Sequence, residues 1–157
     1  MQKIRPFLWF DGKAEEAALF YIGIFKNATL GSVMRYGDAG PGPKGSVMLV
    51  TFTIEEQEFI ALNGSSRFSF TPAISFFVTC ENQDEVDTYW DKLCDGGNPL
   101  QCGWITDKYG VTWQIVPSGL TDMLQDEKPA KATAVMQAMM QMVKLDIRQL
   151  RQAYEQA

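Results

Sequence analysis

The 157-residue sequence contains no histidine. Without an imidazole the chain cannot use histidine acid–base catalysis, a Ser-His or Cys-His nucleophile pair, or imidazole-ligated zinc or iron. The cysteines are three, an odd number without a Cys-x-x-Cys spacing: Cys80, Cys94 and Cys102. This pattern argues against a disulfide framework and against a structural zinc site. We expect three reduced thiols that fill the core.

Long apolar runs and clusters of positive charge are also lacking. No stretch approaches the ~20 apolar residues that span a bilayer, and the N-terminus has no cleavage-type export signal. The 14 Lys and Arg are dispersed in a chain of net charge -5, so the sequence has no electrostatic footprint for nucleic acid. We therefore expect a cytoplasmic protein that binds neither membranes nor nucleic acids. At 46% hydrophobic residues it forms one compact domain, or two small half-domains that share a core.

The first part of the chain, residues 1–65, has the pattern of a strand, a helix and three strands. An apolar run over residues 3–10 is typical of a strand covered on both faces. Apolar residues then recur at three and four, which predicts an amphipathic helix over residues 13–25. Three more strands are expected over residues 29–36, 46–54 and 58–62.

The segment 37–45 is rich in glycine and proline and joins two of these strands. Its order of Gly, Lys and Ser is wrong for a phosphate-binding loop, which needs Gly-Lys-Ser/Thr at the start of a helix. Two prolines also remove backbone donors that would cradle phosphate. We interpret the segment as a hairpin loop, with a flap over a pocket as the alternative.

Residues 66–118 repeat this order with one strand fewer. We expect a strand over 73–80, a helix over 83–94, and strands over 100–106 and 111–116, with a bend at Gly103. Setting Phe10 against Cys80 aligns the two first strands: Trp9 meets Thr79, Phe7 meets Phe77 and Arg5 meets Ser75. The sequence therefore predicts two copies of a βαβββ unit.

Residues 119–157 are a connector followed by a C-terminal helix. A short helical turn is expected at 120–124, and apolar spacing predicts one long amphipathic helix over 130–157. Four of the eight methionines lie between Met136 and Met142. Because methionine adapts well to interfaces, this helix packs either on its own domain or on a second copy, and we favour a homodimer.

The stretch from Asp107 to Pro117 says most about the protein. The turn Asp-Lys-Tyr-Gly leads into a strand with Trp113 and, on the opposite side, the amide Gln114. It resembles the closing strand of the vicinal oxygen chelate superfamily, in which a metal-binding Glu occupies the position of Gln114. Segments that are similar to the PhnB-like branch, often described as 3-demethylubiquinone-9 3-methyltransferase, are 6–17, Phe20-Tyr21, Tyr36-Gly37, 40–46, 61–64 and 101–104.

The resemblance implies an α+β fold of paired βαβββ modules, glyoxalase-like, plus the C-terminal helix. In that superfamily the two modules enclose a cup that holds a divalent metal. The corresponding ligand positions here are Arg5, Ser75, Gln114 and either Ala61 or Asn63, none of them a carboxylate or imidazole. We therefore expect a degenerate metal site and no cofactor. The methyltransferase description also lacks support, since no Gly-x-Gly-x-x-Gly turn leads from a strand into a helix.

Three functional hypotheses remain: a metal-independent protein that binds a small molecule in an aromatic-lined cup, an enzyme of the superfamily, and a dimeric module with a vestigial site. Catalytic residues are unknown, and the first hypothesis predicts a set of ligand-binding residues: Arg5, Phe7, Trp9, Asn63, Ser75, Phe77, Trp104 and Gln114. Arg5 would bind a carboxylate or phosphate, and Gln114 would orient it. The alternative is that these side chains fill a core, with Trp104 closing the sheet.

Overall fold

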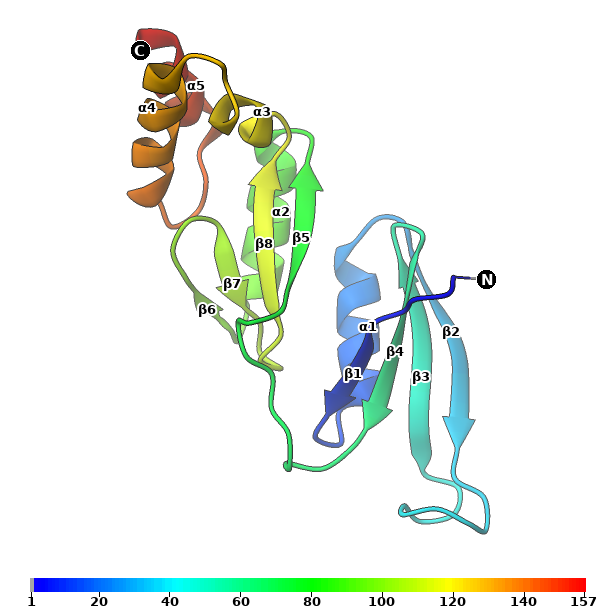
Figure 1. Cartoon of the computed structure of the whole chain (residues 1–157). Helices are drawn as coiled ribbons and strands as arrows, with labels where there is room; N and C mark the ends of the chain where they lie inside the picture. The colour runs from blue at the N-terminus through cyan, green and yellow to red at the C-terminus, as the bar shows by residue number, and fades with distance from the viewer. Residues whose placement is uncertain (1) are drawn as a thin grey trace. The chain divides into compact units, whose positions relative to one another are not determined.

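The computed structural model describes residues 2–157 (Figure 1). Its elements follow the order βαβββ, βαβββ and three helices. The chain divides into two compact units, one that ends at Ser69 and one that covers Phe70–Ala157. Each unit is described by itself.

The first unit is a four-stranded sheet covered on one face by a helix. Its elements are β1 (Phe7–Phe10), α1 (Ala14–Ile24), β2 (Ala28–Arg35), β3 (Val47–Ile54) and β4 (Gln57–Asn63). The strand order is β1-β4-β3-β2, with β1 parallel to β4. The apolar stripe of α1 is buried as its spacing predicts, and it packs on alternate residues of β3 and β4 that include Phe52 and Ala61. The first strand begins at Phe7, later than expected.

The second unit repeats this topology. Its sheet has the order β5-β8-β7-β6 and contains β5 (Ser75–Cys80), β6 (Asn98–Pro99), β7 (Trp104–Thr106) and β8 (Thr112–Pro117). The helix α2 (Gln83–Cys94) has the bounds that its sequence predicts, because Asn82 caps its first turn and four apolar residues are buried in one stripe. The matching strand orders confirm the paired βαβββ fold.

The strand expected over 100–106 is wrong in its first half. The chain turns between β6 and β7, and Cys102 and Gly103 both have left-handed backbone angles, with φ of 60° and 84°. A continuous strand cannot contain such residues. The strand that was missing from the prediction is the two-residue β6 on the other side of this turn.

The single long C-terminal helix is also wrong. The structure has α3 (Leu120–Leu124), α4 (Pro129–Met140) and α5 (Ile147–Gln156). The backbone N–H groups of Cys102 and Gly103 donate to the carbonyls of Met142 and Val143, at 2.9 and 2.7 Å. These carbonyls thus accept hydrogen bonds from the turn before β7, where the predicted helix would have continued. Asp146 caps a new helix by accepting a hydrogen bond from the Gln149 N–H.

The three terminal helices have a core of their own with the end of β8. Its buried members are Val116, Leu120, Val135, Met142, Leu145 and Leu150. None of the helices within residues 2–157 is long and apolar enough to cross a membrane.

Candidate functional site

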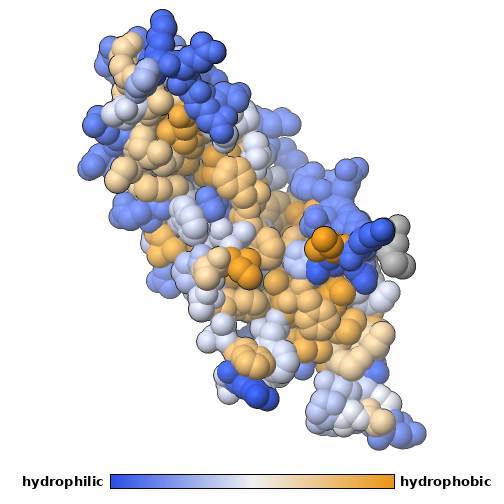
Figure 2. Space-filling model, in the orientation of Figure 1, coloured by the Kyte–Doolittle hydropathy of each residue, from blue (hydrophilic) through white to orange (hydrophobic). Residues whose placement is uncertain are grey.

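The side of the first sheet that faces away from α1, its helix-distal face, carries three of the predicted site residues. Side chains alternate along a strand, so Leu8 and Phe10 are buried toward α1 while Phe7 and Trp9 lie on the opposite side. Phe7 is 54% exposed. On the neighbouring strand β4, Ile60 and Leu62 share this face by register with β1. Figure 2 shows apolar residues gathered over the strands of this unit.

Arg5 lies just before β1 and forms an ion pair with Glu58 of β4. The Arg5 Nη1 to Glu58 Oε1 distance is 3.0 Å, and both side chains are about two-thirds buried, at 32% and 31% exposure. A ligand that used Arg5 to bind a carboxylate or phosphate would have to compete with Glu58. The guanidinium is therefore already committed to a partner within its own unit.

Trp9 is held by the segment that follows β4. Its indole Nε1 donates to the Ser65 carbonyl at 2.8 Å, and Phe68 packs edge-on against the ring at 5.0 Å between centroids. A Cβ at Gly64 would lie 2.1 Å from the Trp9 ring, so the ring occupies space that only glycine leaves open. These contacts fix the ring where β1 and β4 end.

Asn63 does not join the other predicted residues. It shares the α1-facing parity of Phe59 and Ala61, and its amide is used on both sides. Its Oδ1 accepts from the Ala14 N–H at 2.7 Å, and its Nδ2 donates to the Val47 carbonyl at 3.1 Å. The structural equivalent of Gln114 in the first sheet is Ile60, because Phe7 pairs with Ile60 as Phe77 pairs with Gln114.

The second sheet brings the remaining four predicted residues onto its own helix-distal face. Gln114 pairs with Phe77 on one side and with Trp104 on the other, so the three side chains form a row across the sheet. The Gln114 Nε2 donates to the Ser75 Oγ at 2.9 Å. Phe77 is 55% exposed, while Gln114, Ser75 and Trp104 are half-buried.

Thr112 lies on the same face of the sheet and was not predicted. It pairs with Ser75 across β5 and β8, its side chain is 1% exposed, and its Oγ1 has no hydrogen-bond partner among the described residues. A buried hydroxyl without a partner is uncommon in a folded protein. The available signal was its spacing of two from Gln114, which places both on one face.

Asp107 stabilises the Asp-x-x-Gly turn that precedes this strand. The carboxylate is buried, and its Oδ1 accepts from the backbone N–H of Tyr109 and Val111 at 2.8 and 3.1 Å. Its Oδ2 accepts from the Trp113 Nε1 at 2.9 Å. Asp107 thereby closes the turn and orients Trp113 toward α2, which directs the next residue, Gln114, to the other face.

The side chains at the superfamily's metal positions do not fit a divalent cation. Arg5, Ile60, Ser75 and Gln114 provide a guanidinium, an alkyl group, a hydroxyl and an amide, whereas protein sites for divalent ions are built around carboxylates, imidazoles or thiolates. Within residues 2–157 no group of three His, Cys, Asp or Glu could hold a metal. Burial raises the pKa of the Cys80 thiol to about 12, and also raises the pKa of Cys94, so neither readily supplies a thiolate.

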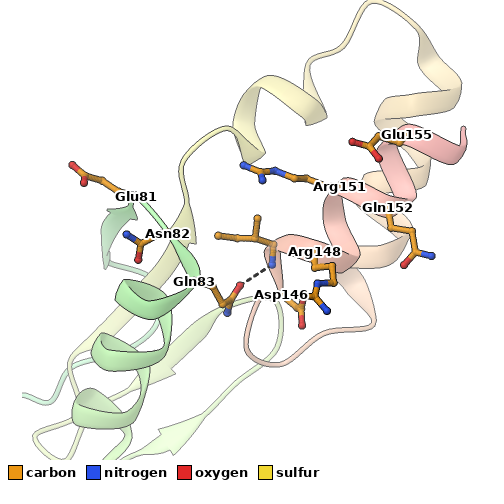
Figure 3. A pocket seen from close by; sticks show the side chains of 9 residues that line it. Glu81, Asn82, Gln83, Asp146, Arg148, Arg151, Gln152 and Glu155 are labelled. Atoms are coloured by element: carbon orange, nitrogen blue, oxygen red, sulfur yellow. Dashed lines mark hydrogen bonds between the residues drawn. The ribbon is translucent and has the colours of Figure 1, made fainter.

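Cavities among the described residues include two that each lie within one unit. One of about 620 Å³ opens at the end of the first sheet, between Trp9 and the β2–β3 loop. The other, of about 890 Å³, lies between the start of α2 and α5 (Figure 3). Its charges alternate in sign, with Glu81, Asp146 and Glu155 beside Arg148 and Arg151. Such a mixed, mostly exposed set is typical of a solvated groove, and none of the predicted site residues lines it.

Two βαβββ modules with this strand order define a glyoxalase-like protein of the vicinal oxygen chelate class. The family model described as 3-demethylubiquinone-9 3-methyltransferase matches residues 2–116, and the chain belongs to this family. The match ends before α3, so the three terminal helices lie outside it. Gly40, Gly42 and Gly45 do have the Gly-x-Gly-x-x-Gly spacing, but they join two strands of a hairpin.

Solved structures agree with this assignment. A putative 3-demethylubiquinone-9 3-methyltransferase, PhnB protein, from Bacillus cereus is 43% identical, with a TM-score of 0.68 over 74% of this chain and 100% of that one. A Pseudomonas aeruginosa protein is 20% identical, with a TM-score of 0.63 over 74% and 98%. The fosfomycin resistance protein FosX of Listeria monocytogenes, complexed with Mn(II) and sulfate, is 16% identical, with a TM-score of 0.54 over 80% and 98%. No curated protein matches significantly.

Proposed function

We propose that the protein binds a small organic molecule without a divalent metal. The observation that carries this proposal is the state of the residues at the superfamily's metal positions. Arg5 forms an ion pair with Glu58, and the Gln114 amide donates a hydrogen bond to Ser75, so each of these polar groups already has a partner. Phe7 and Phe77 lie next to them and are more than half exposed. Aromatic walls with a few oriented polar groups suit organic ligands and do not suit a cation.

A ligand screen tests the proposal on the full chain. Neutral aromatics, aromatic acids, quinones and phosphonates are each added, and the melting temperature is measured together with the metal content of the purified protein. A ligand that binds only the native state must raise the melting temperature. We expect at least one organic class to raise it in metal-free protein. Stoichiometric bound metal that is required for the shift would contradict the proposal, and no shift with any class would favour a vestigial site.

A pair of variants locates the binding. Phe7→Ala removes an exposed ring from the helix-distal face, and Leu19→Ala removes an apolar side chain of similar exposure, 49%, from α1. We expect Phe7→Ala to lower the ligand affinity by roughly tenfold, since one buried aromatic contact is worth about 1–2 kcal/mol. Leu19→Ala serves as the matched control. Equal affinities in the two variants would show that the ligand does not contact Phe7.

We also propose that two copies associate through the terminal helices. Met136, Met140 and Val143 are 41%, 58% and 41% exposed although they are apolar. Light scattering of the full chain should give the mass of a dimer, and Met140→Lys should shift it toward the monomer. A monomeric wild-type protein at high concentration would contradict the proposal.

For the compartment, the cytoplasm is our proposal. Cys80, Cys94 and Cys102 are all free thiols, which suits a reducing environment. Fractionation of cells that produce the protein tests it, and recovery in the membrane or secreted fraction would contradict it.

A further inference from the structure

The cavity at the end of the first sheet identifies a class of ligand. It lies where β1 and β4 end and β3 begins, and Trp9 and Leu62 connect it with the helix-distal face. Its third wall is the loop between β2 and β3, with Tyr36, Pro41 and Gly42. At about 620 Å³ its volume lies in the range of roughly 300–1,000 Å³ that small-molecule sites occupy.

The loop is built to hold its shape. Tyr36 and Ser46 face each other as the last pair of the hairpin, with the Tyr36 N–H donating to the Ser46 carbonyl at 2.9 Å. The Gly45 N–H donates to the Tyr36 carbonyl at 2.8 Å, and the Ser46 hydroxyl donates to the Pro43 carbonyl at 2.6 Å. Two prolines restrict the backbone between these bonds. The loop therefore forms a wall of the cavity.

Two aromatic rings are seated against glycines at this site. A Cβ at Gly42 would lie 2.2 Å from the Tyr36 ring, just as a Cβ at Gly64 would lie 2.1 Å from the Trp9 ring. Each ring thus lies against a glycine, at positions where any other residue would displace it. Both rings line the cavity, so its walls include two aromatic side chains that are held in place.

None of the thirteen residues that line the cavity is charged. The charged loop residues Asp38 and Lys44 form an ion pair with each other at 2.9 Å and remain 90% and 73% exposed. The Asn63 amide and the Ser46 hydroxyl already have partners. Among described residues the Tyr36 hydroxyl has no such partner, so it can form one neutral hydrogen bond with a ligand.

We infer that this cavity binds a flat, uncharged aromatic molecule with one polar group toward Tyr36. The inference rests on the proposed function and specifies its ligand class. A charged group would lose its hydration in this cavity without gaining an opposite charge, which is costly. A planar neutral molecule instead stacks on the Trp9 and Tyr36 rings. This class differs from the carboxylate or phosphate that Arg5 suggests.

Two dyes with the same ring system separate the classes. N-phenyl-naphthylamine is neutral, and anilinonaphthalene sulfonate adds one negative charge. Both become fluorescent in apolar surroundings, so each can be titrated with the full-length protein. We expect the neutral dye to bind at least about tenfold more tightly, since an uncompensated charge costs more than the ~1.4 kcal/mol that a factor of ten represents.

Two glycine variants in the same loop test the site. Gly42→Ala places a methyl group against the Tyr36 ring, whereas Gly37→Ala meets nothing within 4 Å; neither glycine has a positive φ. We expect Gly42→Ala to weaken binding of the neutral dye by about tenfold and Gly37→Ala to leave it within about twofold. Tyr36→Phe should weaken binding of the neutral dye by roughly two- to fivefold, because it removes the hydroxyl that bonds the amine of the dye. Circular dichroism checks that all variants are folded.

The outcomes separate this inference from the proposed function. Equal or tighter binding of the sulfonate at the Gly42-sensitive site overturns the uncharged class and leaves small-molecule binding intact. If Gly42→Ala leaves the affinity for the neutral dye unchanged, the cavity is not the binding site, and the proposed function again stays intact. If neither dye binds and the thermal screen also finds nothing, both proposals fail. Loss of a dimer on Gly42→Ala, without dye binding to wild type, assigns the cavity to a second copy and overturns the inference.

Discussion

At the scale of single residues, Gln114 stands where the superfamily has a metal-binding carboxylate, and none of the other metal positions has a carboxylate or an imidazole either. Ser75 accepts the Gln114 amide, and Arg5 pairs with Glu58. A carboxylate at position 114 alone would therefore face a hydroxyl and no second acidic or imidazole group in its sheet. The departure from a metal site involves several side chains together, which is why we propose an organic ligand.

Asp107 should be the most costly single residue to remove from the second sheet. Asp107→Ala deletes the acceptor for the N–H groups of Tyr109 and Val111 and for the Trp113 indole. We expect the free energy of unfolding in urea to fall by about 2–4 kcal/mol, since these donors would be left in a buried place. Asp107→Asn keeps one acceptor oxygen and should cost less. The exposed Asp95→Ala is the surface control, and an equal effect there would contradict the role of Asp107.

Cys80 should be chemically silent in the native protein. The thiol is fully buried, and burial raises its pKa to about 12, with the negative charge of Glu85 adding to the shift. The thiolate is the reactive form, so almost none is present at pH 8. With iodoacetamide at that pH, mass spectrometry should find Cys80 modified last of the three cysteines, and rapidly only after urea is added. Early modification in the native state would contradict its burial.

At the scale of elements, the sequence predicted those structures whose signals are local. The helix α2 is capped by Asn82 and has one buried apolar stripe, so both signals lie in the helix itself or directly before it. The break between α4 and α5 has a distant cause, because the carbonyls of Met142 and Val143 accept from Cys102 and Gly103. Helical spacing continued across that break, so periodicity alone could not reveal it. The two-residue β6 is likewise defined only by its pairing with β7.

The same limit applied to the site. The positions of Phe7, Trp9, Phe77 and Gln114 on helix-distal faces followed from alternation along each strand. The face of Asn63 did not, because the first module's closing strand has no Asp-x-x-Gly motif to fix its register. Only the pairing of Phe10 with Asn63 shows that Asn63 points toward α1. The Gly42 and Gly64 contacts with aromatic rings also required coordinates.

Gln83 should be the main link between α2 and the terminal helices. Its Nε2 donates to the Asp87 carboxylate and to the Leu145 carbonyl, at 3.0 and 3.1 Å. Its Oε1 accepts from the Ile147 N–H at 2.8 Å, the hydrogen bond that is dashed in Figure 3. Gln83→Ala should lower the free energy of unfolding by about 1–2 kcal/mol and speed hydrogen exchange at the Ile147 amide. Gln152→Ala, on the wall of the same cavity, is the control. Unchanged exchange at Ile147 would contradict the link.

At the scale of the whole molecule, duplication made the fold predictable. Each module has the same order of one outer strand, one helix and three strands, and each sheet has its first strand parallel to its last. The repeat could be read because both copies keep their apolar spacing. The terminal helices have no counterpart in the repeat and lie beyond the matched family residues. Their arrangement could therefore not be predicted by comparison with another part of the chain.

The absence of histidine predicts the pH dependence of the whole protein. No side chain of pKa near 6.5 is present, so stability in urea should be nearly constant between about pH 6 and 8. Two carboxyl groups, Asp87 of α2 and Asp126 between α3 and α4, change this in acid. Hydrogen bonds from Gln83 and Lys144 lower the pKa of Asp87, and a hydrogen bond from Tyr154 lowers the pKa of Asp126, each from 3.8.

A lowered pKa in the folded state means that the folded state favours the ionised carboxylate. Its contribution to stability is complete above the unfolded value of 3.8 and is lost as the pH falls through the lower folded value. We expect urea midpoints to fall below about pH 4, and Asp87→Asn with Asp126→Asn to reduce the slope of that fall. Asp122→Asn, an exposed residue of α3, is the control. A slope unchanged in the double variant would show that other carboxyl groups govern acid unfolding.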